Sequence, residues 1–486
     1  MNALGYRGIA FGTLAVCASM ATPLRAGDEP IAVTLLAKVG DVIDGSTVTD
    51  VLGPTVSPDD KVAFILRLTE QRHAIWYDDG VFFLSDDAPI ALALPYSDAT
   101  VNFDSAGEFV YATRVGDPPR RAIYSSLNGA MSAECDQAPG FPPGVVIWSP
   151  EFPQMMDDGS IYWHARYDQS GLCVSGDARF VLYHRPVAGP ITAIVQDGDM
   201  IDGDQLNGDP FQITRSILSD NGSNMLLRFE EFGFPLGEDE RIAVNGQVVA
   251  SAGSATGSGD NWQYFGYEYA INNDGDYLFF GTTDGSITTR KFLAYDAQII
   301  LRVNQVLGDN VLALDVRDVD INNHNQAAFV WGYRNPASHE AIFFAPDASD
   351  IPGSSIVLLS QGDLIDTDGN GEGDWIIDTI FDNPYGDVTH LIELAENGMI
   401  YAHVELRSLD GSAHNLDAIV AIPLPASSCN PADLAEPFGA LDFSDVTAFL
   451  VAFAGSQPEA DLAAPFGSFD FSDVVAFLTA FGSGCP

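Results

Sequence analysis

Basic side chains are scarce in this chain of 486 residues. Lysine and arginine together number 21, against 68 aspartates and glutamates, and the formal net charge is −47. Proteins that bind nucleic acid neutralise its phosphates with lysine and arginine, so the composition argues against a nucleic-acid partner. It also argues against binding to an anionic membrane surface. The surplus of carboxylates favours a highly soluble protein and offers many oxygen ligands to Ca²⁺.

Long apolar runs are missing after the first 26 residues, so the sequence predicts no membrane-spanning helix. Residues 1–26 are typical of an export signal, because Arg7 precedes a short apolar stretch, GIAFGTLAVCASM, and small residues follow it. Cleavage is expected after Ala21, with Ala26 as the second option, and a lipoprotein signal at Cys17 is the alternative. We therefore predict a protein that is secreted or held at the cell surface.

Cysteine is also rare, with five residues, of which Cys17 lies in the predicted signal. The four that remain are an even number, which in an exported chain predicts disulfides. Three pairings are possible, and the domain organisation favours Cys135 with Cys173 and Cys429 with Cys485. Because no CxxC spacing or nearby histidine accompanies them, zinc binding and thiol catalysis are not predicted.

The chain lacks the common catalytic motifs: GxSxG, the P-loop, HExxH and the Rossmann glycine pattern. Acidic residues are too numerous for a catalytic pair to be assigned. His164 and His403 occupy matching positions, in IYWHA and IYAHV, where packing within a sheet is the usual role and lining a channel is the alternative. Trp262 and Trp375, beside acidic loops, are candidates for stacking on a sugar. We predict a non-enzymatic protein, with a glycosidase or lyase as the alternative.

What the chain does contain is a repeat. Residues 27–425 hold seven copies of an extended stretch, a polar turn and further aromatic-rich strands, as in NNDGDYLFFG and AENGMIYAHV. Asp-Gly and Asn-Gly between apolar strands predict hairpins, because both turn positions need positive φ. Matching turn positions lie 47 to 73 residues apart, which is room for a four-stranded sheet. These positions are Asp60, Gly107, Gly159, Gly222, Gly275, Asn325 and Gly398.

The repeat predicts a mainly β fold, a seven-bladed β-propeller over residues 27–425. The last copy stops after its third strand, DAIVAIPLP (417–425), and the stretch IAVTLLAKVGD (31–41) resembles the fourth strands of other copies. We therefore expect the N-terminal strand to complete the last blade, which leaves no open sheet edge. A six- or eight-bladed ring and a pair of β-sandwiches are the alternatives. The pattern resembles that of uncharacterised propeller-like repeat proteins secreted by bacteria, a resemblance that implies no activity.

One acidic loop predicts a Ca²⁺ site. The connection GDLID (362–366) runs into DTDGNGEGD (366–374), where oxygen-bearing side chains alternate with glycine. Short loops of this kind wrap Ca²⁺ in oxygens, and a solvated turn whose aspartates bond their own backbone is the alternative. The candidate ligands are Asp366, Asp368, Asn370, Glu372 and Asp374.

After a linker, residues 426–428, the composition changes. Residues 441–453 (LDFSDVTAFLVAF) and 469–481 (FDFSDVVAFLTAF) are near copies of each other. Apolar residues at i, i+3, i+4 and i+7 predict an amphipathic helix in each copy, and an aspartate pair at each start predicts a capping box. The two apolar stripes are Val446, Phe449, Leu450 and Phe453, and Val474, Phe477, Leu478 and Phe481.

The duplication, the flanking cysteines and the Asp-Phe-Ser-Asp core make residues 429–486 resemble a dockerin of the GC type. The resemblance implies two half EF-hand loops that bind Ca²⁺ and helices that dock a cohesin-like partner on a scaffold or cell surface. It also implies the Ca²⁺ ligands Asp433, Asp442, Asp445, Asp461, Asp470 and Asp473. The third and fifth loop positions are apolar here, so weak Ca²⁺ binding or a metal-free pair of capped helices is expected.

These helices are apolar nearly all round, which is typical of helices that are buried or docked. We expect a partner to contact the residues before each helix and on its uncovered side. The candidates are Phe443, Ser444, Val451, Phe471, Ser472 and Val475.

The sequence therefore predicts an exported, non-enzymatic propeller that binds a glycan or a protein and is attached through its dockerin-like tail. A carbohydrate-active enzyme delivered to a complex by its tail is the second hypothesis, and a structural surface protein is the third. The lining of the propeller channel separates them, because an enzyme requires close carboxylates or a histidine–acid pair there.

Overall fold

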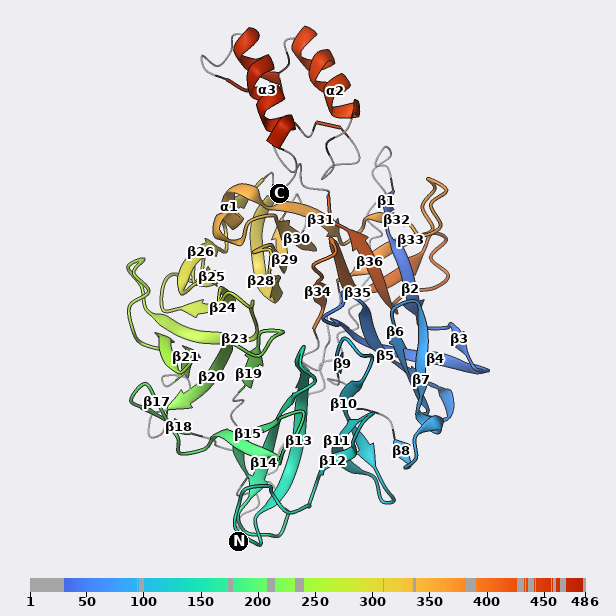
Figure 1. Ribbon diagram of the computed structural model, residues 1–486, viewed down its shortest axis with the longest axis vertical. Helices are drawn as coiled ribbons and strands as arrows, with labels where there is room; N and C mark the ends of the chain where they lie inside the picture. The colour runs from blue at the N-terminus through green and yellow to red at the C-terminus, as the bar shows by residue number, and fades with distance from the viewer. Residues whose placement is uncertain are drawn as a thin grey trace, which may run out of the picture.

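The computed structural model describes residues 30–93, 95, 100–173, 178–207, 215–231, 240–308, 310–334, 338–380, 390–425, 432, 434–435, 441, 443–455, 457, 460–463 and 469–483. The predicted export signal, Cys429, Asp433, Asp442 and Cys485 lie outside these residues. Within them the strands form seven sheets, and Figure 1 shows these following one another around a ring in chain order.

Three sheets come from the first part of the chain. The first contains β3 (Val42–Ile43), β4 (Ser46–Val56), β5 (Val62–Leu68), β6 (His73–Tyr77) and β7 (Gly80–Leu84). The second contains β8 (Leu92–Ala93), β9 (Val101–Phe103), β10 (Phe109–Val115), β11 (Arg120–Ser125) and β12 (Gly129–Ala133). The third contains β13 (Val146–Met155), β14 (Ile161–Asp168), β15 (Ala178–Arg185) and β16 (Thr192–Gln196).

Three more sheets follow in the same way. The fourth contains β17 (Met200–Ile201), β18 (Asp204–Asn207), β19 (Arg215–Leu218), β20 (Met225–Glu231), β21 (Glu240–Val244) and β22 (Gln247–Ser251). The fifth contains β23 (Trp262–Ile271), β24 (Tyr277–Thr283), β25 (Lys291–Tyr295) and β26 (Gln298–Arg302). The sixth contains β27 (Val306–Leu307), β28 (Asn310–Ile321), β29 (Ala327–Arg334), β30 (Ser338–Ala345) and β31 (Ile356–Ser360).

The last sheet is composite, because both ends of the propeller contribute to it. It contains β1 (Ile31–Ala32), β2 (Thr34–Lys38), β32 (Leu364–Asp366), β33 (Trp375–Thr379), β34 (Ile392–Leu394), β35 (Met399–Ser408) and β36 (Leu416–Pro423). Strand β2 pairs antiparallel with β36, and β1 pairs parallel with β32. The described chain thus has six blades that are continuous in sequence, not the predicted seven, and a composite sheet that the N-terminal strand completes as predicted.

The propeller core lies between the sheets. Seven buried hydrophobic clusters each join two neighbouring sheets, and together they follow the ring. Between the fifth and sixth sheets, for example, Leu278 and Leu293 pack with Phe329, Trp331 and Phe343. This packing explains why the strands carry apolar residues on both faces: both faces of every sheet are covered.

The helices in the described part of the propeller are short. They are the 3₁₀ helices η1 (Thr69–Gln71), η2 (Ser85–Asp87) and η4 (Ala348–Asp350), and the α-helix α1 (Ile351–Ser354). No helix in the described part of the chain has the length and hydropathy needed to cross a bilayer. The predicted disulfide between Cys135 and Cys173 is present, with the two Cα atoms 5.3 Å apart.

The tail contains the two predicted helices, α2 (Phe443–Ala454) and α3 (Phe471–Ser483). Phe449 and Phe477 stack with ring centroids 4.2 Å apart, and both are buried. The predicted apolar stripes are wrong at one position in each helix, because Leu450 and Leu478 are more than half exposed. Two helices cannot cover an apolar surface that extends nearly all round each of them.

Candidate functional site

The innermost strands of the seven sheets line a central cavity. Its residues come from β4, β9, β13, β19, β23, β28 and the segment that leads into β34, and it encloses about 1000 Å³ with the open solvent at its mouth included. A polar cavity on the axis of a ring, where many strands contribute side chains, is a natural ligand site.

The two walls of this cavity differ. The wall from β19, β23, β28 and β34 carries most of the charge, whereas the opposite wall is polar and aromatic. We call the first the charged wall and define it by Arg215, Asp220, Glu268, Asp318, Asp320, His390 and Glu393. The opposite wall contains Thr55, Thr100, Asn102, Phe152 and Gln154.

A buried ion pair lies at the centre of the charged wall. The Nη1 atom of Arg215 lies 2.8 Å from Oε1 of Glu268, and these side chains are only 8% and 6% exposed. The guanidinium also donates to the carbonyl of Tyr267 and lies 4.8 Å from the ring centroid of Phe152. Phe152 has φ of 48°, a region that bulky residues rarely adopt, and such outliers cluster at functional sites.

Asp318 and Asp320 fasten the sixth sheet to the composite sheet. The Oδ2 atom of Asp318 accepts the backbone N–H groups of Leu391 and Ile392, and Oδ2 of Asp320 accepts that of Leu394. Burial, reinforced by the charge of Glu268, raises the pKa of Asp318 well above its ordinary value. Burial also raises the pKa of Asp320 to about 7, against the opposing effect of its backbone donors.

His390 and Glu393 face the same space. The Nδ1 atom of His390 lies 3.9 Å from a carboxylate oxygen of Glu268 and 3.9 Å from one of Glu393. Burial lowers the pKa of His390, and burial together with the neighbouring acids raises that of Glu393. Gly53 permits this arrangement, because a Cβ there would lie 2.2 Å from the backbone oxygen of His390.

At one end of the cavity, the hairpin turns are joined to one another. The backbone N–H of each turn donates to a side chain of the next: Asn221 to Asn273, Asn273 to Asn323, Asn323 to Glu396, and Glu396 to Asp60. These turns surround a second, smaller cavity. The sequence predicted the turns from their glycines but did not indicate that their polar side chains connect the sheets.

The charged wall was also missed, although a signal for it exists. In three successive copies of the repeat, the residue four positions before the start of the turn is charged. These residues are Arg215, Glu268 and Asp318. Aligning the copies would have placed these charges at one level of the ring.

The predicted Ca²⁺ loop is partly assembled. Asp366, Asp368 and Asp374 each bring one carboxylate oxygen to within 4.8 Å of the others, whereas Glu372 is not in that group. Both oxygens of Asp366 already accept backbone N–H groups, from Gly369 and Gly371 among others, and these bonds lower its pKa. The cluster is therefore a possible metal site, but its backbone bonds favour the alternative of a self-bonded turn.

In the tail, two predicted Ca²⁺ ligands bind backbone instead. Asp445 is fully buried and accepts the N–H groups of Leu434 and Ala435, and Asp473, 28 residues later, repeats this with Leu462 and Ala463. Each aspartate thus holds its loop against the start of its helix, and the described residues fit the metal-free alternative better. Asp470 accepts the N–H of Ser472, and Asp461 is half-buried; Ca²⁺ at these loops stays a prediction.

The residues predicted to meet a partner are largely on the surface of the tail. Phe443 and Phe471 are 80% and 76% exposed, and Val451 and Val475 are also exposed. Ser472 is exposed and Ser444 is half-buried. The duplicated Leu450 and Leu478 extend this surface.

The aromatic and histidine candidates lie in the core of the propeller. His164 and His403 are buried between sheets, and burial lowers their pKa values to about 3 and about 4. Trp262 packs among phenylalanines and is 3% exposed, so its predicted role in stacking on sugar is wrong. Trp375 is half-buried, with Lys38 near its ring.

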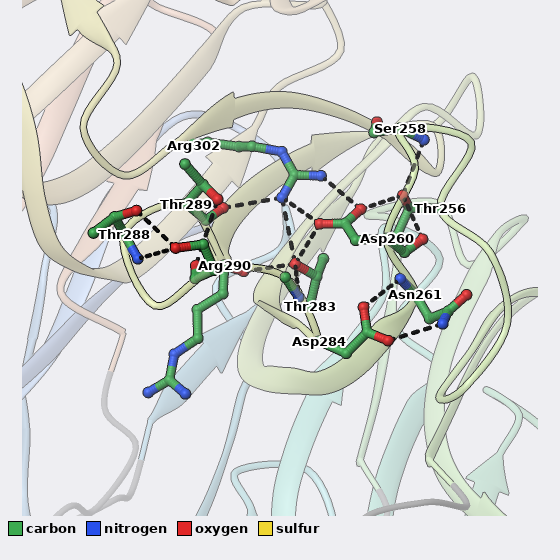
Figure 2. A network of polar contacts seen from close by, with 12 residues as sticks. Thr256, Ser258, Asp260, Asn261, Thr283, Asp284, Thr288, Thr289, Arg290 and Arg302 are labelled. Atoms are coloured by element: carbon green, nitrogen blue, oxygen red, sulfur yellow. Dashed lines mark hydrogen bonds and ion pairs between the residues drawn. The ribbon is translucent and has the colours of Figure 1, made fainter.

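A separate polar network lies at the end of the fifth sheet remote from its turn (Figure 2). Arg302 forms two parallel bonds to Asp260, which also accepts the hydroxyls of Thr256 and Thr283. Burial opposes ionisation, but the three donors outweigh it and hold the pKa of Asp260 at about 2. Because both carboxylate oxygens are paired, this network stabilises the sheet end and contrasts with the charged wall.

No family model matches the chain, and no curated protein does. Among solved structures, the β-propeller domain of the Trilobed protease from Pyrococcus furiosus is 12% identical, with a TM-score of 0.38 over 64% of this chain and 85% of that one. The polysaccharide lyase Uly1 is 10% identical, with a TM-score of 0.37 over 82% of this chain and 90% of that one. The six-bladed fungal Aleuria aurantia lectin is 8% identical, with a TM-score of 0.29 over 63% and 91%. Likenesses this weak carry no argument about ligand or activity, and the propeller rests on strand order and packing.

Proposed function

We propose that this protein is an exported binding protein that holds a polyhydroxylated, sugar-type ligand in the central cavity of its propeller. The observation that carries the proposal is the pairing of the two walls. Carboxylates and an imidazole on the charged wall can bond hydroxyl groups, and the ring of Phe152, where the two walls meet beside Arg215, adds an apolar surface. In this proposal the composite sheet serves as a seventh blade, because hydrophobic clusters join it to both neighbours.

The test is calorimetric titration of the full chain with a panel of neutral, acidic and amino-containing oligosaccharides. A ligand is expected to lose affinity at least tenfold in Glu393→Gln, whose side chain is 21% exposed in the cavity. The matched control is Asp410→Asn, in the loop after β35. A panel without a binder, or a binder equally affected by both variants, would refute the proposal.

The second candidate is a carbohydrate-active enzyme, and one observation favours it. The charged wall contains a histidine–acid pair and several close carboxylates, which is the lining that an enzyme requires. Acids whose pKa is raised by burial, beside a second carboxylate, are the usual arrangement for general acid catalysis. Chromatography of the bound oligosaccharide after long incubation separates the two candidates, because only an enzyme releases shorter products that Glu393→Gln abolishes.

We propose further that the tail attaches the propeller to a cohesin-like or other cell-surface protein. The support is the exposed apolar surface that both helices present at equivalent positions, Phe443 with Phe471 and Leu450 with Leu478. A reporter fused to residues 429–486 should remain on cells, and Phe443→Ser with Phe471→Ser should release it, whereas Thr447→Ser should not. Release of the unmutated fusion into the medium would contradict the attachment. N-terminal sequencing of the mature protein tests the proposed removal of residues 1–26.

A further inference from the structure

Three potential metal ligands meet on the charged wall from three neighbouring sheets. Glu268 lies on β23, Asp318 on β28, and His390 just before β34. One ligand atom from each lies within 4.8 Å of the other two. Both oxygens of Asp318 also accept backbone N–H groups, from Val319, Leu391 and Ile392, so a metal would share this carboxylate with the backbone. Residues so far apart in the chain converge here only because the ring places their strands side by side.

Glu268 has one carboxylate oxygen without a hydrogen-bond donor among the described residues. Its side chain is 6% exposed, and Arg215 occupies Oε1. Among the described residues no hydrogen-bond donor reaches Oε2, and the nearest nitrogen of His390 is 3.9 Å away, which is too far for a hydrogen bond. The imidazole of His390 likewise has no hydrogen-bond partner among the residues that the structure describes. Both residues line the cavity, so these ligand atoms are open to an ion that enters it.

A shared metal ion would account for this spacing. Two nitrogen or oxygen ligands at about 2.0–2.2 Å from one ion, at a tetrahedral angle, are about 3.3–3.6 Å apart, so the 3.9 Å between His390 and Glu268 needs to close by only a few tenths of an ångström. The composition also suits a cation, since five acidic side chains share the charged wall with one guanidinium, and a bound cation favours the ionised form of an acid beside it. These carboxylates are Asp220, Glu268, Asp318, Asp320 and Glu393.

We propose that Glu268, Asp318 and His390 form a binding site for one divalent transition-metal ion, of the Zn²⁺ or Mn²⁺ class. An imidazole with two carboxylates suits these ions, whereas Ca²⁺ and Mg²⁺ prefer oxygen ligands alone. Three protein ligands leave a coordination position open toward the cavity. If the proposed ligand binds there, one of its oxygens takes that position; the metal site itself does not depend on that ligand.

The test uses the full chain, stripped with a chelator and titrated with Zn²⁺, Mn²⁺ and Ca²⁺ by calorimetry. We expect one equivalent of Zn²⁺ or Mn²⁺ to bind, and His390→Gln to weaken it at least tenfold. His414→Gln is the matched control, because His414 lies 3.7 Å from Asp378 at the surface. Asp368→Asn tests the acidic loop, and it should leave this affinity unchanged.

His390→Gln is the main variant because it leaves the Arg215–Glu268 ion pair in place, and circular dichroism checks its fold. Anomalous diffraction at the metal edge of crystals soaked in Zn²⁺ should place the ion between Glu268 and His390. Three results would overturn the proposal: no binding of either transition metal, undiminished binding in His390→Gln, or loss of binding in His414→Gln or Asp368→Asn.

Discussion

Replacement of Arg215 by methionine should destabilise the propeller severely. The substitution keeps much of the apolar stem but removes the guanidinium from Oε1 of Glu268, 2.8 Å away, in a pair that is less than one-tenth exposed. Removing one partner of a buried ion pair leaves an uncompensated charge and costs about 3–5 kcal/mol. The free energy of unfolding should therefore fall by about 4 kcal/mol, roughly a thousandfold in the folding equilibrium.

The assay is urea denaturation, followed by tryptophan fluorescence in the presence of a chelator. The double variant Arg215→Met/Glu268→Met should recover to within about 1 kcal/mol of the wild type, because both charges are then gone. The matched control is Arg120→Met, whose partner Asp136 is about half exposed, and it should cost no more than about 0.5 kcal/mol. A loss below about 1 kcal/mol in the single variant, or no recovery in the double variant, would refute the reasoning.

Three further predictions concern an acid, a buried ring and the disulfide. Burial and two neighbouring carboxylates raise the pKa of Asp417 to about 7, so the folded state holds a proton that the unfolded state has lost, and stability falls as the pH rises from about 4 to about 7. Asp417→Asn should raise the free energy of unfolding by about 1–2 kcal/mol at pH 8, a figure reduced to allow for the partial exposure of Asp417, and should leave it unchanged at pH 3. Thermal melts at the two pH values measure this difference, and equal gains at both would contradict the reasoning. Phe477→Ala removes a buried ring from the tail, costs about 3–5 kcal/mol and should expose the tail to limited proteolysis, whereas the exposed Leu478→Ala should not. Replacing both Cys135 and Cys173 by serine opens a loop with a sequence separation of 38 and should cost up to about 4 kcal/mol; an unchanged urea midpoint would count against it.

The hairpins and the closing strand could be predicted from sequence because their signals are local. An Asn-Gly turn between apolar stretches specifies its own geometry, and IAVTLLAKVGD resembles the strands that it replaces in the composite sheet. The charged wall depends instead on which sheets lie next to each other around the ring. Glu268 and His390 are more than 100 residues apart, so no spacing rule relates them.

In the tail, the helices can be predicted from the sequence, whereas the role of the aspartates cannot. The duplicated helices form where the apolar periodicity places them, because two phenylalanines suffice to pair them. The same aspartates that the pattern assigns to Ca²⁺ accept backbone N–H groups in both copies. A carboxylate at the start of a helix satisfies free N–H groups with or without a metal. The position of Asp445 and Asp473 in the sequence therefore does not distinguish the two roles.

The candidate site and the closure of the ring depend on the same residues. The composite sheet has no continuous chain of its own, and Asp318 and Asp320 attach its inner strand to the sixth sheet. On the other side, the backbone N–H of Glu396 donates to the carboxylate of Asp60. Gly53 lets β4 approach the backbone of His390. The contacts between the composite sheet and its two neighbours, here called the seam, are held in part by buried carboxylates, which brings acids and an imidazole to the axis of the ring. Packed leucines in the same place would leave a wall with no polar group that could bind a ligand. The residues that close this ring also line the charged wall, so a ligand or cation that binds there should strengthen the seam.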